Sequence, residues 1–166
     1  MKRTLPPLVV LLSILVAMSC SPNAAPTAGA KAPDFELSNT AGQTVRLSDY
    51  LGRPVAVNFW GIECVYCVEE MPDLQKAFEQ ESTKTDGVAW ITVNVQDSLD
   101  GVRAYFADKG YTLPALADSR GQVAQAYGIS AIPITFLIDR EGIVRYVKRG
   151  MFLSINEINV ALNRIR

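Results

Sequence analysis

Two apolar segments constrain the fold of this 166-residue chain more than any other feature: VAVNFW at 55–60 and VAWITVNV at 88–95. Both are rich in β-branched residues, and neither alternates strictly between apolar and polar residues. Segments of this kind are typical of strands that are covered on both faces. The chain is therefore expected to be an α/β protein with a buried sheet between layers of helices.

Helical periodicity follows each of these strands. In the first helix, apolar side chains recur at spacings of four, three and four residues, at Cys67, Met71, Leu74 and Phe78. A second helix is expected over 99–109, with Gly110 as its C-cap, and a short third helix over 122–127.

The last helix carries both of the common helix-start signals. Ser154 and Glu157 have the spacing of a capping box, while Leu153 and Ile158 have that of a hydrophobic staple. Its apolar face consists of Ile155, Ile158, Leu162 and Ile165.

Two β-hairpins complete the pattern. FEL at 35–37 and TVRL at 44–47 surround a turn at 39–42, and the turn DREG joins ITFLID at 134–139 to IVRYVKR at 143–149. No internal repeat and no second domain are evident, so 33–166 is expected to form a single domain.

The N-terminus has the features of an export signal. Lys2 and Arg3 precede an apolar run over 5–18, whose fourteen residues are fewer than the roughly 20 that cross a bilayer as a helix. We assign 1–19 as a signal peptide. An uncleaved membrane anchor is the alternative.

Cys20 ends this segment in the sequence LVAMSC, which resembles the lipobox of bacterial lipoproteins. The resemblance implies that Cys20 carries a lipid and attaches the protein to a membrane. The alternative is an unmodified thiol, which is an oxidation liability outside the cell. The residues after Cys20 are rich in Pro, Ala and Ser, so 20–32 is expected to be a flexible tether.

Composition excludes several functions. The chain has no histidine, which rules out Ser-His and Cys-His catalysis and removes the commonest ligand of zinc and copper. Its formal net charge of −1 provides no basic surface of the kind that binds nucleic acid.

The pair Cys64 and Cys67 is the candidate reactive site. A structural disulfide between them would add little stability, because it closes a very short loop. A structural zinc site is also not expected, because such sites need four ligands and this domain offers two thiols. Redox exchange remains. Cys64 is expected at a helix N-terminus, which stabilises a thiolate, and Cys67 lies one turn in, on the apolar stripe. Cys64 would attack a client disulfide, and Cys67 would then resolve the mixed disulfide.

Three motifs resemble the thioredoxin fold: WGIECVYC at 60–67, the proline five residues after the second cysteine (Pro72), and AIP at 131–133. The stretches KAPDFEL…LSDYLGRPVAVNFW and GISAIPITFLIDREGIV are more narrowly similar to the TlpA/ResA-type thiol–disulfide oxidoreductases, which are extracytoplasmic and attached to membranes. The resemblance covers about 31–166. It implies a central mixed sheet flanked by helices, an N-terminal β-hairpin extension and a central insertion that contains a helix.

The same resemblance implies functional residues. Pro133 would be a cis-proline beside the active site, with substrate contacts at Trp60, Ile132 and Pro133. Glu70 corresponds to a functional glutamate three residues after the second cysteine. The partners would be client proteins with disulfides or thiols, for example in cytochrome c maturation, and an extracytoplasmic or membrane electron donor.

The chain also departs from the family pattern. Glu63 precedes the first cysteine where many relatives have tryptophan or proline, and Val65 and Tyr66 replace the better-known residue pairs between the cysteines. Asn58 stands where thioredoxin carries a buried acid. These differences bear on the redox potential and the partner rather than on the type of reaction.

The two acids after the motif are expected to differ. On a helix of about 100° per residue, Glu70 lies about 60° from Cys67, whereas Glu69 lies about 200° away on the solvated face. Desolvation beside the apolar stripe would raise the pKa of Glu70. Such an acid can take the proton of Cys67. The alternative is that Glu70 is an exposed acid near the helix start.

Three other functions share parts of the pattern. A copper- or heme-delivery module would use the CxxC thiolates as ligands, and a peroxiredoxin-like antioxidant shares the APDFEL…LSDYLG opening but needs a Thr-x-x-Cys site. A disulfide-forming oxidase would need a cation near Cys64, and no histidine lies between the cysteines. We therefore predict a lipid-anchored, extracytoplasmic protein-disulfide reductase that needs no cofactor and no metal.

Overall fold

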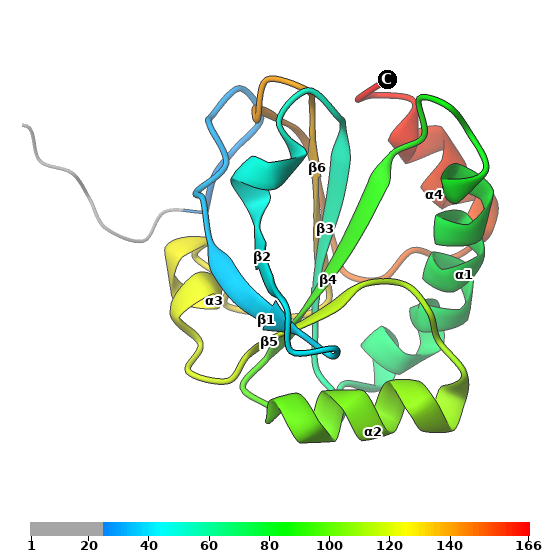
Figure 1. Ribbon diagram of the computed structural model, residues 1–166. Helices are drawn as coiled ribbons and strands as arrows, with labels where there is room; N and C mark the ends of the chain where they lie inside the picture. Colours follow the sequence, from blue (N-terminus) through cyan, green and yellow to red (C-terminus); the bar gives the residue numbers. More distant parts are fainter. Residues whose placement is uncertain (1–24) are drawn as a thin grey trace, which may run out of the picture.

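The computed structural model describes residues 25–166, which form one mixed β-sheet with helices on both faces (Figure 1). In the described part of the chain the strands are β1 Glu36–Asn39, β2 Thr44–Arg46, β3 Val55–Trp60, β4 Ala89–Val95, β5 Ala115–Asp118, β6 Ile134–Ile138 and β7 Val144–Arg149. The helices are α1 Val65–Ser82, α2 Leu99–Lys109, α3 Gln122–Ala126 and α4 Ile155–Leu162, with a 3-10 turn at Leu47–Tyr50.

The sheet has the order β2-β1-β5-β4-β3-β6-β7, so β3 lies near its centre. Strand β3 pairs in parallel with β4 and antiparallel with β6, and all six of its residues are buried, as predicted. The parallel pair needs a crossover connection, which α1 supplies. This arrangement brings the end of β3, the start of α1 and the start of β6 together at one end of the sheet.

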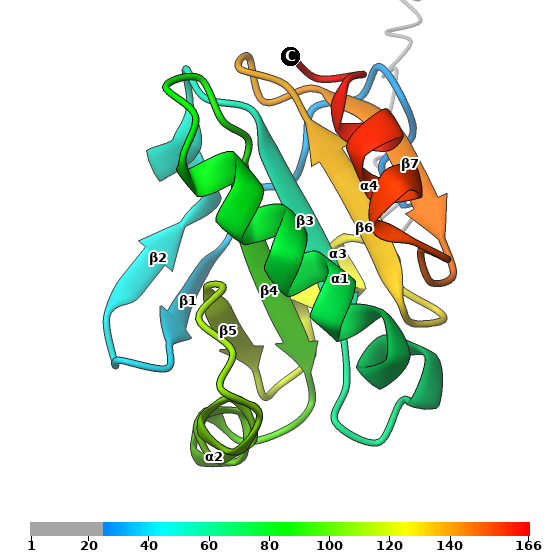
Figure 2. The same ribbon diagram turned by 90° about the vertical axis from the view of Figure 1, so that its right-hand side faces the viewer.

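Successive side chains along each strand point to opposite faces of the sheet, so the domain has one hydrophobic core on each face. Ala56 and Trp60 of β3 point toward α1 and α4, where they join Met71 and Leu74. On the other face, apolar side chains of the sheet pack against α3 and the residues that precede β1: Val57, Phe59, Ile91, Phe136, Tyr127 and Phe35. Figure 2 shows α1 and α4 side by side across the first of these faces.

Strand β5 was missed by the sequence analysis. It pairs in parallel with β4 and also carries the predicted β1–β2 hairpin, since Ser38 lies opposite Ala117. The hairpin and the α2–β5 segment therefore extend the sheet together on the side away from β6. The sequence of β5 is only four residues long, follows Pro114 and ends in Asp118, so its pattern is too weak to predict a strand.

The helix ends agree with the prediction for α2 and differ for α4. Gly110 caps α2 in the left-handed conformation, with φ of 69°. At α4, the Ser154 hydroxyl accepts a hydrogen bond from the Glu157 N–H, but the Glu157 carboxylate accepts from the Leu153 N–H, one residue earlier than a capping box requires. The predicted staple is wrong, because Phe152 turns into the core and leaves Leu153 78% exposed.

The last residues of the predicted tether are bonded to the sheet. Gly29 N–H donates to Val144 O at the start of β7, and Ala32 N–H donates to Gly142 O in the β6–β7 turn. Residues 29–32 therefore belong to the folded domain. The predicted signal peptide and Cys20 lie outside the described residues. Within 25–166, no helix is long and apolar enough to cross a membrane.

Candidate active site

The cysteine pair lies where β3 passes into α1. Cys64 is the N-cap residue of α1, with extended backbone angles, and Cys67 is in the first turn. The two sulfur atoms form a disulfide with an S–S distance of 2.16 Å. Cys67 is fully buried and Cys64 is partly exposed, so the outer and inner roles predicted for them agree with their positions.

The Cys64 sulfur has two backbone neighbours. It accepts a hydrogen bond from the Cys67 N–H at 3.3 Å, and it lies 3.7 Å from the carbonyl oxygen of Ile132. The first contact is the kind that stabilises a thiolate at a helix N-terminus. The Ile132–Pro133 peptide bond is cis, as the resemblance implied. The closeness of Ile132 O to the Cys64 sulfur shows that the start of β6 lies against the disulfide.

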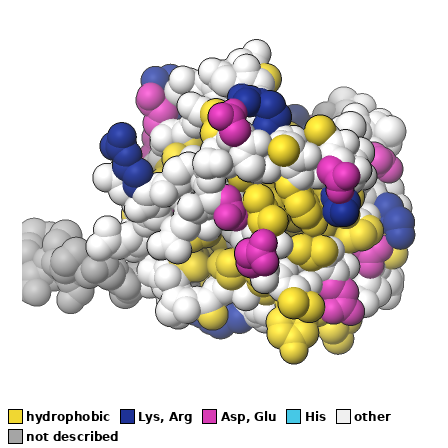
Figure 3. Space-filling view, turned by 90° about the horizontal axis from the view of Figure 1, so that it is seen from below, with side chains coloured by type: hydrophobic (Ala, Val, Ile, Leu, Met, Phe, Trp, Pro, Cys, Tyr) yellow, Lys and Arg dark blue, Asp and Glu magenta, His cyan; other side chains and the backbone are white. Residues whose placement is uncertain are grey.

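Apolar residues lie next to Cys64 in the chain and across from it on the β6 side. Val65 and Tyr66, between the cysteines, are 75% and 63% exposed, and Ile132 is half-buried. The view from below in Figure 3 faces this end of the sheet and shows hydrophobic side chains gathered together, with acidic side chains beside them. This end of the domain therefore presents apolar side chains with acidic ones beside them.

Glu70 is buried, whereas Glu69 is exposed, as predicted. Both oxygens of the Glu70 carboxylate are held: Oε1 accepts from Asn58 Nδ2 at 2.9 Å, and Oε2 accepts from the Phe152 N–H at 2.8 Å. Burial raises the pKa of Glu70 to about 7, and these two hydrogen bonds together with the charge of Lys148 oppose that rise. An acid with this pKa can both take and release a proton near neutral pH.

Trp60 is fully buried, so the predicted contact with a substrate does not agree with its position. Its ring packs against Tyr105 and Phe106 of α2, with centroid distances of 5.4 and 5.6 Å. Trp60 thus joins the end of β3 to α2 from inside the domain. Of the three predicted substrate contacts, Ile132 and Pro133 remain, and only Ile132 has a partly exposed side chain.

The loop between β7 and α4 supports the site from the other side. The Gly150 N–H donates to Pro133 O at 2.9 Å, and two residues later the Phe152 N–H binds Glu70. One short loop therefore holds both the cis-proline segment and the buried acid.

Sequence reasoning missed two polar side chains of this site. Asn58 was predicted only to replace a buried acid, and Thr135, which accepts a hydrogen bond from Asn58 Nδ2 at 2.9 Å, was not predicted to belong to the site. Both are single polar residues within otherwise apolar strands, and that interruption is the signal that could have identified them.

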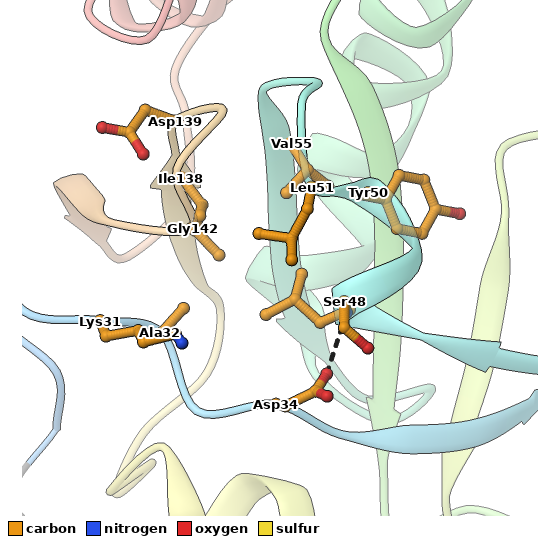
Figure 4. A pocket seen from close by; sticks show the side chains of 11 residues that line it. Lys31, Ala32, Asp34, Ser48, Tyr50, Leu51, Val55, Ile138, Asp139 and Gly142 are labelled. Carbon is orange, nitrogen blue, oxygen red and sulfur yellow. Dashed lines mark hydrogen bonds between the residues drawn. The ribbon is translucent and has the colours of Figure 1, made fainter.

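A separate cavity of about 90 Å³ lies at the opposite end of the sheet (Figure 4). Leu51, Val55 and Ile138 line it, and at its edge Asp34 binds Ser48. Since β6 runs from Ile134 beside the disulfide end to Ile138, this cavity is distant from the cysteines. Among the described residues, no group of three or more His, Cys, Asp or Glu side chains is placed to hold a metal ion.

The fold and the site together define a class of protein. Because the Cys64–Cys67 disulfide caps the helix after a central strand and lies against the cis Ile132–Pro133 bond, the chain has the build of a thiol–disulfide oxidoreductase.

Comparison with known proteins gives the family. A model of the AhpC/TSA family matches residues 28–147, so the chain belongs to that family. The thiol-disulfide oxidoreductase ResA of Geobacillus thermodenitrificans strain NG80-2 is 36% identical over 149 residues, which cover 86% of this chain and 84% of that protein. The enzyme is thus of the TlpA/ResA type.

Solved structures agree with this assignment. A thiol:disulfide interchange protein DsbE from Chlorobium tepidum is 29% identical, with a TM-score of 0.73 over 83% of this chain and 99% of that one. The exposed lipoprotein thioredoxin Etrx1 of Streptococcus pneumoniae strain TIGR4 is also 29% identical, with a TM-score of 0.66 over 80% of this chain and 100% of that one. Disulfide exchange was the first of the functions predicted from the sequence.

Proposed function

We propose that this enzyme works as a reductase: its reduced CxxC pair donates two electrons to disulfides of specific client proteins outside the cytoplasm. The observation that carries the proposal is the asymmetry of the pair. Cys64 is partly exposed among apolar residues at a helix N-terminus, while Cys67 is buried one turn before an acid whose pKa is about 7.

The reaction has two steps. The Cys64 thiolate attacks one sulfur of the client disulfide, which forms a mixed disulfide and releases the other client sulfur as a thiolate. Glu70 then takes the proton of Cys67, and the Cys67 thiolate attacks the Cys64 sulfur. The second client thiol leaves, and the Cys64–Cys67 disulfide remains. An extracytoplasmic or membrane dithiol must then return two electrons to the enzyme.

Client binding would use the segment beside the disulfide. Ile132 lies beside the Cys64 sulfur, and the exposed Val65 and Tyr66 stand between the two cysteines in the chain. An extended client segment with apolar side chains around its cysteine fits this surface. Disulfides of apocytochrome c would be one such class of client.

The location also belongs to the proposal. The positive and then apolar N-terminus, followed by Cys20, supports export and attachment through a lipid on Cys20. The structurally similar Etrx1 is named an exposed lipoprotein.

Trapping the mixed disulfide tests the function. In Cys67→Ala the second step is blocked, so we expect client proteins to accumulate in disulfide linkage to Cys64 in the native host. The matched variant Cys64→Ala should trap none of them. If Cys67→Ala captures no protein, or if the purified protein retains copper and does not reduce insulin disulfides, the reductase proposal is wrong.

A further inference from the structure

The contact between Asn58 and Glu70 joins a buried amide to a buried acid. Asn58 lies on β3 and is fully buried, and its Nδ2 donates both to Glu70 Oε1 and to Thr135 Oγ1, each at 2.9 Å. Its Oδ1 is buried and has no hydrogen-bond partner among the described residues. A buried polar atom without a partner is uncommon and calls for a reason.

The hydrogen-bonding capacity of the amide supplies that reason. In the observed orientation Asn58 is a donor to Glu70, so it serves the ionised carboxylate. A half-turn of the amide exchanges Nδ2 and Oδ1, and Oδ1 would then accept from the protonated carboxyl and from the rotatable hydroxyl of Thr135. The partner of Oε2 cannot change in this way, because the Phe152 N–H is only a donor.

We propose that Asn58 is a positioning residue that keeps Glu70 hydrogen-bonded in both of its protonation states by turning its amide as the proton arrives and leaves. Thr135 follows the turn, since its hydroxyl accepts in one orientation and donates in the other. This inference rests on the proton-transfer role proposed for Glu70. The amide of Asn58 offers both a donor and an acceptor, whereas leucine at this position would offer neither and a carboxylate would repel Glu70.

The other charged groups around Glu70 have different roles. Lys148 of β7 lowers the pKa of Glu70 and Glu157 of α4 raises it, and the two form an ion pair with each other. Cys67 on α1 is in the disulfide and does not titrate in the oxidised protein. Asn58 and Thr135 are therefore the neutral partners that can respond to the proton.

Nuclear magnetic resonance of the oxidised full chain tests the inference directly. The side-chain carboxyl carbon of Glu70 and the amide group of Asn58 are followed across the pH range 5 to 9. We expect both signals to change with a single midpoint. In Asn58→Leu both hydrogen bonds are lost, and the bond to the ionised form is the stronger because it is charge-assisted. The midpoint of Glu70 should therefore rise by about one pH unit, and Thr135→Val should shift it by a smaller amount.

Thr92→Val is the matched control. Thr92 lies opposite Asn58 on β4, is equally buried, and donates its hydroxyl to Pro114 O rather than toward Glu70. The Thr92→Val substitution should therefore leave the titration midpoint of Glu70 unchanged. If Asn58→Leu does not fold, the wild-type amide signal and Thr135→Val still decide the question.

Two results would overturn the inference: an Asn58 amide signal that does not follow the Glu70 midpoint, or a Thr135→Val shift no larger than that of Thr92→Val. Failure of the reductase proposal looks different. In that case Glu70→Gln would not affect resolution of the mixed disulfide, while the coupled titration of Asn58 and Glu70 would still be observed.

Discussion

The Ile62 N–H donates a hydrogen bond of 3.0 Å to Oδ2 of Asp97, which ties the loop before the first cysteine to the loop after β4. The same carboxylate oxygen accepts from Asn94 Nδ2 at 2.9 Å, and Asn94 is fully buried on β4. The position of the CxxC is therefore set not only by β3 and α1 but also by the Asp97 side chain, which lies thirty-five residues after Ile62 in the chain.

Asp97→Ala should loosen this loop without unfolding the domain. Removing a carboxylate that two donors share is expected to lower the free energy of unfolding by about 1–3 kcal/mol and to slow insulin reduction several-fold. Chemical denaturation and a turbidity assay measure the two effects. Asp100→Ala is the control, since Asp100 is an exposed acid paired with Arg103 at the surface. Equal effects of the two substitutions would contradict a positioning role for Asp97.

Glu70→Gln should slow the resolution of the mixed disulfide and remove a pH-dependent step with a midpoint near 7. The reason is that glutamine keeps the size of the side chain but cannot take the Cys67 proton. Stopped-flow measurement of client-thiol release as a function of pH follows this step. Glu69→Gln is the matched control, because Glu69 is exposed on the opposite face of α1. The same small effect from both substitutions would make Glu70 a structural acid only.

The stability of the oxidised protein should depend on pH through Glu70. Its pKa is about 7 in the folded state, against an ordinary value of 4.5. Below 4.5 both states hold the proton. Between 4.5 and 7 only the folded state does, so its stability falls as pH rises through this window. The full loss is about 3 kcal/mol.

Urea denaturation at pH 5 and pH 8 measures this loss, and Glu70→Gln should abolish most of the difference between the two pH values. If the wild type and Glu70→Gln depend on pH equally, the carboxylate of Glu70 is better solvated than its 2% exposure indicates.

The sequence predicted the centre of the fold well, because local patterns were strong there. Strands β3 and β6 and helix α2 agree with the expected ranges to within about one residue, since β-branched runs and a glycine C-cap mark their ends. Strand β5 is different: its place between β4 and β1 depends on pairing with distant segments rather than on its own four residues.

The site was predicted in part for the same reason. Burial of Glu70 followed from helical geometry. Its two hydrogen bonds join α1 to β3 and to the β7–α4 loop, and contacts between such separate elements cannot be predicted from local residue spacing. Burial of Trp60 could have been anticipated, because Ala56 and Trp60 lie on the same face of β3. Phe152 rather than Leu153 is buried because of how this loop packs against the core, and the local sequence pattern cannot predict that choice.

The redox potential should lie nearer that of thioredoxin, about −270 mV, than the −120 mV or so of the strongly oxidising bacterial enzymes. The exposed Glu63 precedes Cys64, and no histidine or other cation stands between the cysteines, so the thiolate gains little beyond the helix N-terminus and the Cys67 N–H. Equilibration with glutathione or dithiothreitol buffers measures the potential. In Glu63→Gln the potential should become less negative. A wild-type value close to −120 mV would reverse the assignment from reductase to oxidase.

Cys20→Ala should either block processing of the N-terminus or release the enzyme from membranes. Lipidation needs the thiol of Cys20, and the 5–18 apolar run is shorter than a membrane-spanning helix, so a processed chain without the lipid keeps no anchor. Fractionation of cells into membrane and soluble parts measures the change, and metabolic labelling with a palmitate analogue shows whether the lipid is present. Ser21→Ala is the control and should stay in the membrane fraction with its label. A Cys20→Ala protein that is processed normally and remains equally membrane-bound would show that the chain is attached in another way, because neither the lipid nor the signal segment would then be holding it.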